Sequence, residues 1–205
     1  MGVRNVLQER YSLTRPDRQK AERFVAHLEP IQRQLAVYCS RALNRSDETA
    51  DVLQSAIANA FRDFDKYSEG TNFRAWMFRY VTLETLNRNR AASRLPSVLD
   101  EPHFFETHAL DFESFRLETL LDDPEAVLDH CDGVVAQSIG ELTEQERKIL
   151  LLRAVGDFKY REIAEIMNVP MGTVMGLLSR ARTQLRSKLL DYARQHGLLS
   201  KGDSA

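Results

Sequence analysis

The sequence of 205 residues has few cysteines, no long apolar run and no leader-like N-terminus. Its two cysteines, Cys39 and Cys131, lie far apart and match no disulfide or zinc-binding spacing. No segment approaches the roughly 20 apolar residues that a membrane-spanning helix needs. Residues 1–15 lack the apolar core of a signal peptide. We therefore expect a protein of the reducing cytoplasm that does not insert into a membrane.

Patterns that carry catalysis or hold a cofactor are also missing. The sequence has no phosphate-binding glycine loop, no nucleophile elbow and no HExxH zinc motif. Its five histidines do not cluster at metal-ligand spacings, and the nearest approach to a metal site is His130-Cys131 between Asp129 and Asp132. We expect a protein that is not an enzyme and that uses no cofactor or metal.

Charge of one sign is scarce or absent in particular segments, although the whole chain carries a net charge of only −2. That balance argues against a protein that coats nucleic acid. Residues 97–132 contain eleven acidic side chains and one basic one, Arg116, whereas residues 171–190 contain four basic side chains and no acidic ones. Residues 73–94 contain five arginines and one acid, Glu84. This segregation predicts separate electrostatic roles for separate segments.

The sequence is rich in helical periodicity, first over residues 21–94, where apolar residues repeat every three to four positions. Pro30 interrupts the first stripe and predicts either a kink or a fresh helix start. The run Ser46-Asp47-Glu48 is a candidate cap for the next helix, and Asn72 is a candidate cap for the one after it. We expect one small helical domain over residues 21–94, preceded by an arm of residues 1–20.

A second helical domain is expected over residues 125–196, between an acidic linker of residues 95–124 and a tail of residues 197–205. Thr143 and Glu146 have the spacing of a capping box. No segment shows the alternating apolar pattern of a β-strand, so the predicted fold class is all-α, with two small helical domains joined by the linker. Helix ends are expected at Gly156, Asn168 and Gly197, which leaves a short helix at residues 160–167 and a long one at residues 171–194.

Residues 160–180 fit the geometry of a helix-turn-helix. A small residue, Ala164, stands where two steeply crossing helices come closest, and four residues later Asn168 tolerates the left-handed conformation that a sharp turn needs. The second helix of this motif enters the major groove of DNA, and basic residues beyond it can neutralise phosphates. A helical hairpin in an ordinary bundle is the alternative. The cap before the motif and the acid-free helix after it favour DNA binding.

Two sets of short motifs lie along the chain in a set order. The first comprises residues 51–54, 60–61 and 73–79 (Phe-Arg-Ala-Trp-Met-Phe-Arg). The second comprises residues 141–147, 151–153, 160–166, 170–174 and 180–186. Joined by one linker, they resemble the second and fourth conserved regions of bacterial RNA polymerase sigma factors, as found in the compact extracytoplasmic-function group of the sigma-70 family.

The resemblance implies a sigma factor that binds core RNA polymerase and directs promoter recognition, DNA melting and transcription initiation. The second region would bind the clamp helices of the largest polymerase subunit through Asp51, Gln54 and Arg62. The next loop and helix would take a flipped base of the melted minus-ten element, through Ser68, Asn72, Arg79, Asn87, Arg88 and Arg90. Trp76 and Tyr80 are candidate stacking platforms, but they share a helix face with Phe73 and Met77, which favours the core.

The fourth region would read the minus-thirty-five element through Thr173, Ser179, Arg180, Arg182 and Arg186. The chain departs from the family at Met175-Gly176-Leu177, where basic residues are usual. We therefore expect recognition of DNA bases here to depend less on basic side chains. The acidic linker would occupy a basic channel of the polymerase, or serve only as a solvated spacer. The resemblance also implies a possible anti-sigma partner.

Rival interpretations belong to other classes of protein. A sigma-mimic would keep the fold and bind an anti-sigma protein without initiating transcription. A stand-alone repressor would bind DNA through the helix-turn-helix but would not need the first domain. A metal-dependent helical enzyme is the most distant rival.

Overall fold

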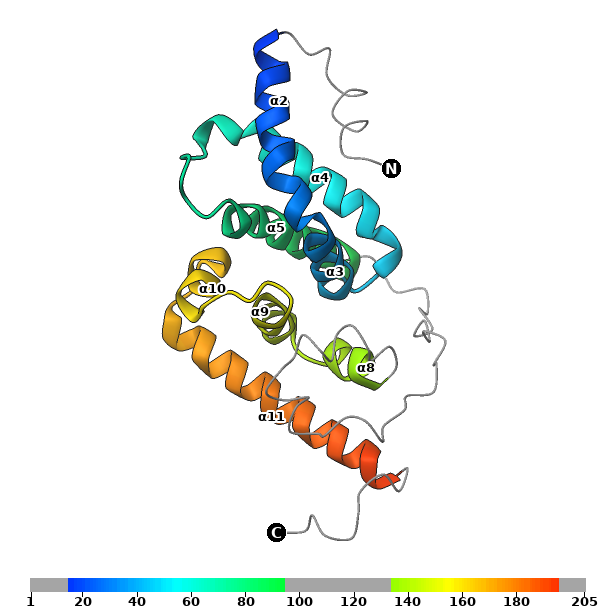
Figure 1. The fold of residues 1–205 in the computed structure, drawn as a ribbon. Helices are drawn as coiled ribbons and strands as arrows, with labels where there is room; N and C mark the ends of the chain where they lie inside the picture. Colours follow the sequence, from blue (N-terminus) through cyan, green and yellow to red (C-terminus); the bar gives the residue numbers. More distant parts are fainter. Residues whose placement is uncertain (1–14, 95–133, 196–205) are drawn as a thin grey trace. The chain divides into compact units, whose positions relative to one another are not determined.

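The computed structural model describes residues 15–94 and 134–195, and every regular element within them is a helix (Figure 1). The chain divides into two compact units, residues 1–96 and residues 97–205. The all-α fold class is confirmed for the described residues. The expected acidic linker and C-terminal tail lie outside these residues. None of the described helices is long and apolar enough to span a membrane.

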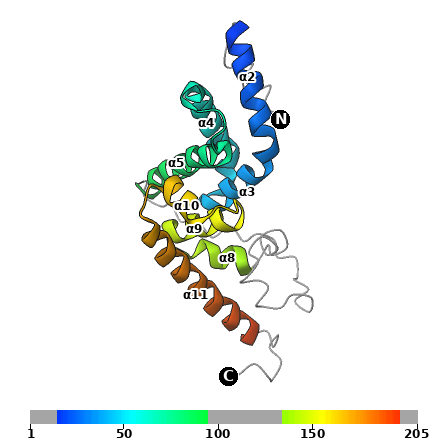
Figure 2. The ribbon, with the colours of Figure 1, turned by 60° about the vertical axis from the view of Figure 1, so that its left-hand side comes forward.

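The N-terminal unit consists of α-helices joined by short 3-10 helices. Its elements are α2 (Arg15–Leu28), η1 (Glu29–Ile31), α3 (Gln32–Ala42), η2 (Ser46–Glu48), α4 (Thr49–Arg62), η3 (Phe64–Lys66) and α5 (Phe73–Arg94). Helix α5 packs against α3 and α4, and the views in Figures 1 and 2 show α4 crossing α5. Helix α2 begins at Arg15, so part of the expected N-terminal arm is helical.

The structure decides two expected helix boundaries in this unit, one at Pro30 and one at residues 46–48. Pro30 lies in the first turn of η1, where its missing N–H costs no hydrogen bond, and the chain restarts as α3. The expected cap at residues 46–48 is wrong: these residues form η2, and no side-chain cap bond precedes α4. Instead the Thr49 hydroxyl donates to the Ser46 carbonyl at 2.6 Å. The residue directly before α4, Glu48, has φ −85° and ψ 0°, which are helical angles and not the extended ones of a capping residue.

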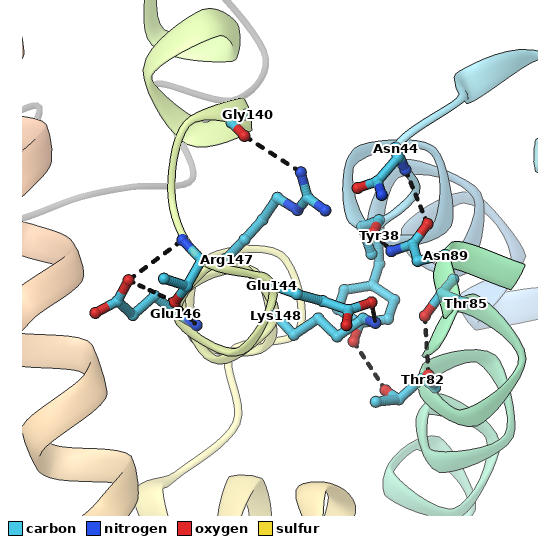
Figure 3. A network of polar contacts seen from close by, with 12 residues as sticks. Tyr38, Asn44, Thr82, Thr85, Asn89, Gly140, Glu144, Glu146, Arg147 and Lys148 are labelled. Carbon is cyan, nitrogen blue, oxygen red and sulfur yellow. Dashed lines mark hydrogen bonds and ion pairs between the residues drawn. The ribbon is translucent and has the colours of Figure 1, made fainter. Parts of the chain in front are cut away.

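Buried polar contacts fix α5 against α3 (Figure 3). The hydroxyl oxygens of Tyr38 and Thr82 lie 2.8 Å apart in the core. The Asn89 side chain is buried as well; it donates to the Ala42 carbonyl at 3.0 Å and accepts from the Asn44 backbone N–H at 3.0 Å. The buried side chains of Tyr38, Thr82 and Asn89 therefore all have hydrogen-bond partners, and sliding α5 along α3 would leave them unpaired.

The C-terminal unit contains α8 (Val134–Gly140), α9 (Glu144–Ala154), α10 (Tyr160–Met167) and α11 (Met171–Gln195). Helix α11 packs along α8, α9 and α10, and it lies on one side of them in both ribbon views. The expected capping box is confirmed at the start of α9. The Glu146 N–H donates to the Thr143 hydroxyl at 3.4 Å, and the Thr143 N–H donates to the Glu146 carboxylate at 3.3 Å.

A glycine follows the end of α9 because the backbone there passes close to the Phe158 ring and the Leu152 carbonyl. The last helical residue is Ala154. A β-carbon on Gly156 would lie 2.5 Å from the Phe158 ring and 2.8 Å from the Leu152 carbonyl oxygen. Asp157 follows with φ 44°, in the left-handed region. Only a residue without a side chain allows this approach, and the buried Phe158 then closes the end of the helix.

Candidate nucleic-acid interface

One left-handed residue sets the turn between α10 and α11. Asn168 has φ 53° and ψ 50°, and its N–H donates to the Ala164 carbonyl. The Val169 N–H donates to the same carbonyl at 3.0 Å, and the Pro170 carbonyl accepts from the Thr173 N–H at 2.9 Å. The left-handed conformation expected of Asn168 is confirmed. It gives the steep turn of a helix-turn-helix, with α11 as the second helix.

Apolar side chains fill the space behind α11. Ile163 and Val174 are fully buried, Leu178 is 2% exposed, and Met167 is half-buried. Leu177 is also buried, at 6% exposure. The family-departing stretch at residues 175–177 is therefore not one surface, because its last residue belongs to the core.

All five residues expected to bind the minus-thirty-five element are exposed on α11: Thr173, Ser179, Arg180, Arg182 and Arg186. On a helix of about 3.6 residues per turn, Arg182 and Arg186 project from one side of the exposed surface. Thr173 and Arg180 project from the other side. Ser179 lies near Arg186, two turns before it on the same side. The recognition helix thus presents cations on both flanks, which suits a groove lined on both sides by phosphates.

Arg180 differs from the other cations of α11 because it also binds α9. Its Nε lies 3.2 Å from Oε1 of Glu146, whose side chain is only 4% exposed. The other carboxylate oxygen, Oε2, accepts from the Thr143 hydroxyl at 2.6 Å, and Figure 3 shows Glu146 at the start of α9. The capping box at the start of α9 is therefore also an anchor for the recognition helix. Sequence reasoning missed this link, because 34 residues separate its partners.

The Glu146 carboxylate is stabilised in its charged form. The Thr143 hydroxyl, and after it the Arg180 guanidinium, lower the pKa of Glu146 below its ordinary value, against the opposing effect of burial. Glu146 is consequently ionised at neutral pH. The Arg180 side chain remains 62% exposed, so its outer nitrogens remain accessible to DNA while Nε is held.

In the N-terminal unit, the four α5 residues expected at the minus-ten element lie on two sides of the helix. Arg79, Asn87 and Arg90 are exposed and share one side. Arg88 projects from another side, where its Nε lies 3.5 Å from a carboxylate oxygen of Glu48. Three of the four expected residues therefore share one side of α5.

The loop before α5 carries the other two residues expected there, Ser68 and Asn72, both exposed. The Asn72 side-chain oxygen accepts from the Ala75 N–H at 3.0 Å, which confirms Asn72 as the cap of α5. The Ser68 carbonyl accepts from the Thr71 hydroxyl at 2.7 Å, and Gly70 supplies the positive φ, 84°, that the turn needs. The loop therefore has a defined shape before any partner binds.

Trp76 is half-buried, so it has the expected core position only in part. Its ring centroid lies 5.5 Å from those of Tyr67 and Phe73 and 4.8 Å from that of Tyr80. The Tyr80 hydroxyl donates to Asp63 at 3.0 Å. Burial, together with this bond, raises the pKa of Tyr80 to about 12. Trp76 and Tyr80 thus form a fixed aromatic pair beside the arginines of α5.

The three residues expected to bind the polymerase share one side of α4. Asp51 and Arg62 are exposed and Gln54 is half-buried. The Arg62 guanidinium donates to the Asn59 side-chain oxygen at 2.8 Å, and the Asn59 amide nitrogen donates to Glu84 of α5 at 2.6 Å. Arg62 is therefore held by a chain of side chains that links α4 to α5.

Among the residues that the structure describes, no group of three or more His, Cys, Asp or Glu side chains is placed to hold a metal ion. The nearest sequence candidate, His130-Cys131, lies outside these residues. His27 stacks on the ring of Phe73, with centroids 5.0 Å apart. Its role in the described unit is aromatic packing.

Each of the two units matches the model of a known protein family. The model of sigma-70 region 2 matches residues 28–95, and the model of sigma-70 region 4 matches residues 133–185. The chain is 32% identical over 161 residues to the RNA polymerase sigma-H factor of Pseudomonas aeruginosa, which covers 76% of this chain and 80% of the relative. It is 27% identical over 154 residues to the ECF RNA polymerase sigma factor SigW of Bacillus subtilis, covering 75% and 81%.

Solved structures share the fold. The sigma factor RpoE of Bartonella quintana, in complex with the anti-sigma factor NepR, aligns with a TM-score of 0.62 and 20% identity, over 82% of this chain and 97% of that one. CnrH, in complex with the cytosolic domain of CnrY, aligns with a TM-score of 0.57 and 23% identity, over 86% and 95%.

Proposed function

The chain belongs to the extracytoplasmic-function group of the sigma-70 family of bacterial RNA polymerase sigma factors, and from this premise we propose how its residues divide the work of transcription initiation. Helix α4 binds the clamp helices of the largest polymerase subunit. Helix α5 and the loop before it bind the melted minus-ten element. Helix α11 reads the minus-thirty-five element in the major groove.

The observation that carries the minus-thirty-five assignment is the exposed surface of α11. A formed helix-turn-helix directs Thr173, Ser179, Arg180, Arg182 and Arg186 away from the core of their unit. No acidic residue occurs between Met171 and Leu190 to repel phosphates. Arginine is suited to both tasks on DNA, since it binds guanine edges through two hydrogen bonds and neutralises phosphates.

On α5, exposure favours Arg79, Asn87 and Arg90 over Arg88 as residues that bind the minus-ten element. Arg79, Asn87 and Arg90 share a side with the half-exposed edge of Trp76, so a base flipped out of the stack has an aromatic surface and phosphate contacts nearby. Arg88 would have to leave Glu48 before binding DNA. We expect a smaller part for it in minus-ten recognition.

The chain would contribute recognition and melting, and the polymerase would contribute the chemistry of RNA synthesis. We therefore propose a protein without enzymatic activity of its own that acts in the cytoplasm, where the polymerase works. One similar solved structure, that of RpoE, contains the anti-sigma factor NepR, and we propose that a protein of this class also controls this chain.

Reconstitution with core polymerase tests the proposal. Holoenzyme assembled from the full chain should produce run-off transcripts of defined length from promoter fragments that it enriches from genomic DNA. Core polymerase alone should not. A chain that binds an anti-sigma protein but yields no transcript from any enriched fragment would instead be a sigma-mimic.

A further inference from the structure

The described residues expose three large apolar side chains, and two of them lie on the recognition helix. Met171 is 51% exposed and Met175 is 49% exposed, one helical turn apart at the start of α11. The third, Leu83, belongs to α5 in the other unit. Exposed apolar side chains that recur along one line of a helix point to a surface that another molecule covers.

The position of the two methionines on the helix is defined by its buried side. Val174, Leu178 and Leu185 face the core. On a helix of about 3.6 residues per turn, positions 171, 175, 182 and 186 fall within about 60° of one another, at the edge of the exposed surface. Met171 and Met175 are therefore continuous with the line of Arg182 and Arg186.

The surface beside this line carries no bulky side chain. Gly172, Gly176, Ser179 and Thr183 follow one another along the side of α11 that faces away from the core. A β-carbon on Gly172 would meet nothing within 4 Å, and one on Gly176 would meet only the Arg180 guanidinium at 3.9 Å. The helix backbone can therefore approach a flat partner closely enough for the methionine side chains to reach it.

We infer that Met171 and Met175 contact thymine methyl groups in the major groove of the minus-thirty-five element, an inference that rests on the function proposed for α11. The C5-methyl of thymine is the apolar group that distinguishes a base edge in this groove. A flexible thioether adapts to such a surface. The charge along α11 fits DNA, because Arg182 and Arg186 extend the same line and no acid occurs on α11 before Asp191. The acid beside Met171, Glu165 of α10, lies 3.5 Å from the Arg161 guanidinium, which offsets its charge.

Replacing thymine by deoxyuridine, which removes only the methyl group, tests the inference. Holoenzyme would be titrated with duplexes carrying the minus-thirty-five element that it selects from a random pool, with each thymine replaced in turn. At one or two positions the wild-type chain should bind about fourfold more weakly, the change expected for one buried methyl group. Met171→Ala and Met175→Ala should each bind thymine DNA more weakly and lose this sensitivity at one position.

Arg186→Ala is the matched control, because it should weaken binding to all duplexes and retain the deoxyuridine effect. Unchanged melting temperatures would show that the variants fold. Equal deoxyuridine effects in the wild-type chain and both methionine variants would overturn the inference while leaving the proposed function intact. So would methionine variants that bind DNA normally but no longer bind an anti-sigma protein, since the patch would then serve a protein partner. If binding did not depend on the minus-thirty-five element at all, the proposed function of α11 would fail as well.

Discussion

At the scale of single residues, one carboxylate serves two structural purposes. Glu146 completes the capping box of α9 and also holds Nε of Arg180. An arginine held at one nitrogen loses less conformational freedom when it binds DNA. We therefore regard Glu146 as a positioning residue for the recognition helix, acting through Arg180.

The first prediction concerns pH. Because the pKa of Glu146 is lowered in the folded chain, its contribution to stability is present above the ordinary value of about 4.3. The contribution is lost as the pH falls through the lowered pKa. Glu146→Gln should be less stable than wild type at pH 7 in urea unfolding, and the difference should shrink below about pH 4. A difference that stays constant from pH 7 to pH 3 would mean that the charge of Glu146 contributes nothing.

The second prediction separates two arginines of α11. Arg186→Ala should weaken binding to all DNA sequences similarly and reduce the salt slope by roughly one unit, with no loss of stability. Arg180→Ala should relax the preference at one base position, at a cost of about 1–3 kcal/mol. It should also lower stability, because Glu146 loses its partner. Fluorescence anisotropy across a salt series, paired with thermal unfolding, distinguishes the two patterns; identical behaviour of both variants would refute the distinction.

At the scale of elements, two glycines of the C-terminal unit show opposite requirements. Gly156 lies where a side chain would collide with Phe158 and with the Leu152 carbonyl. Gly176 lies inside α11, where a β-carbon would meet only the Arg180 guanidinium, at an ordinary contact distance of 3.9 Å. The first is needed for the α9–α10 connection to close, and the second is unfavourable for the helix itself, where glycine costs about 0.5–1 kcal/mol relative to alanine.

The third prediction uses this pair. Gly156→Ala should destabilise the chain by about 1–3 kcal/mol through overpacking. Its matched control, Gly176→Ala, should be neutral or stabilising by up to about 1 kcal/mol. Both are measured by urea unfolding followed by circular dichroism. Equal effects of the two substitutions would show that the close approach at Gly156 is unimportant.

Local rules predicted the elements of the recognition motif well. The capping box at Thr143, the left-handed Asn168 and the bounds of α10 all depend on neighbouring residues, so their sequence signals are strong. The 3-10 turn η2 (Ser46–Glu48) was missed because a serine followed by acids carries the signature of a cap. Leu177 was grouped with a surface stretch, although its spacing from Val174 and Ala181 already places it on the core side.

The candidate sites were harder to predict because their geometry comes from contacts between helices. Nothing in the sequence pairs Arg180 with Glu146, or Arg88 with Glu48, since each pair joins residues far apart in the chain. The periodicity of α5 could place Arg79 and Arg90 on one side. It could not show which arginine is already bound to an acid.

At the scale of the whole molecule, two units with separate exposed faces suit a promoter with two separate elements. In the function that we propose, the N-terminal unit binds the polymerase through one side of α4 and melted DNA through one side of α5. The C-terminal unit binds the duplex through α11. Binding through several surfaces at once gives an affinity that neither unit has alone.

The fourth prediction tests the polymerase face. Asp51→Ala combined with Gln54→Ala should weaken binding of the chain to core polymerase, because the exposed Asp51 and the half-exposed Gln54 share the side of α4 that we propose binds the clamp helices. Helical content should stay unchanged. Glu165→Ala, at an exposed position of α10 in the C-terminal unit, is a control that should bind core polymerase normally. Wild-type affinity of the double variant in an anisotropy titration would remove the assignment of α4.

The division of labour between the two units is tested most directly by run-off transcription on paired templates, one fully duplex and one with a non-complementary, pre-melted minus-ten region. Arg79→Ala combined with Arg90→Ala should abolish transcription from the duplex template and recover much of it on the pre-melted one, because melting is then no longer required. Arg182→Ala combined with Arg186→Ala should lose activity on both templates to the same extent as deletion of the minus-thirty-five element. If both double variants respond identically to pre-melting, the two units do not divide the work in this way.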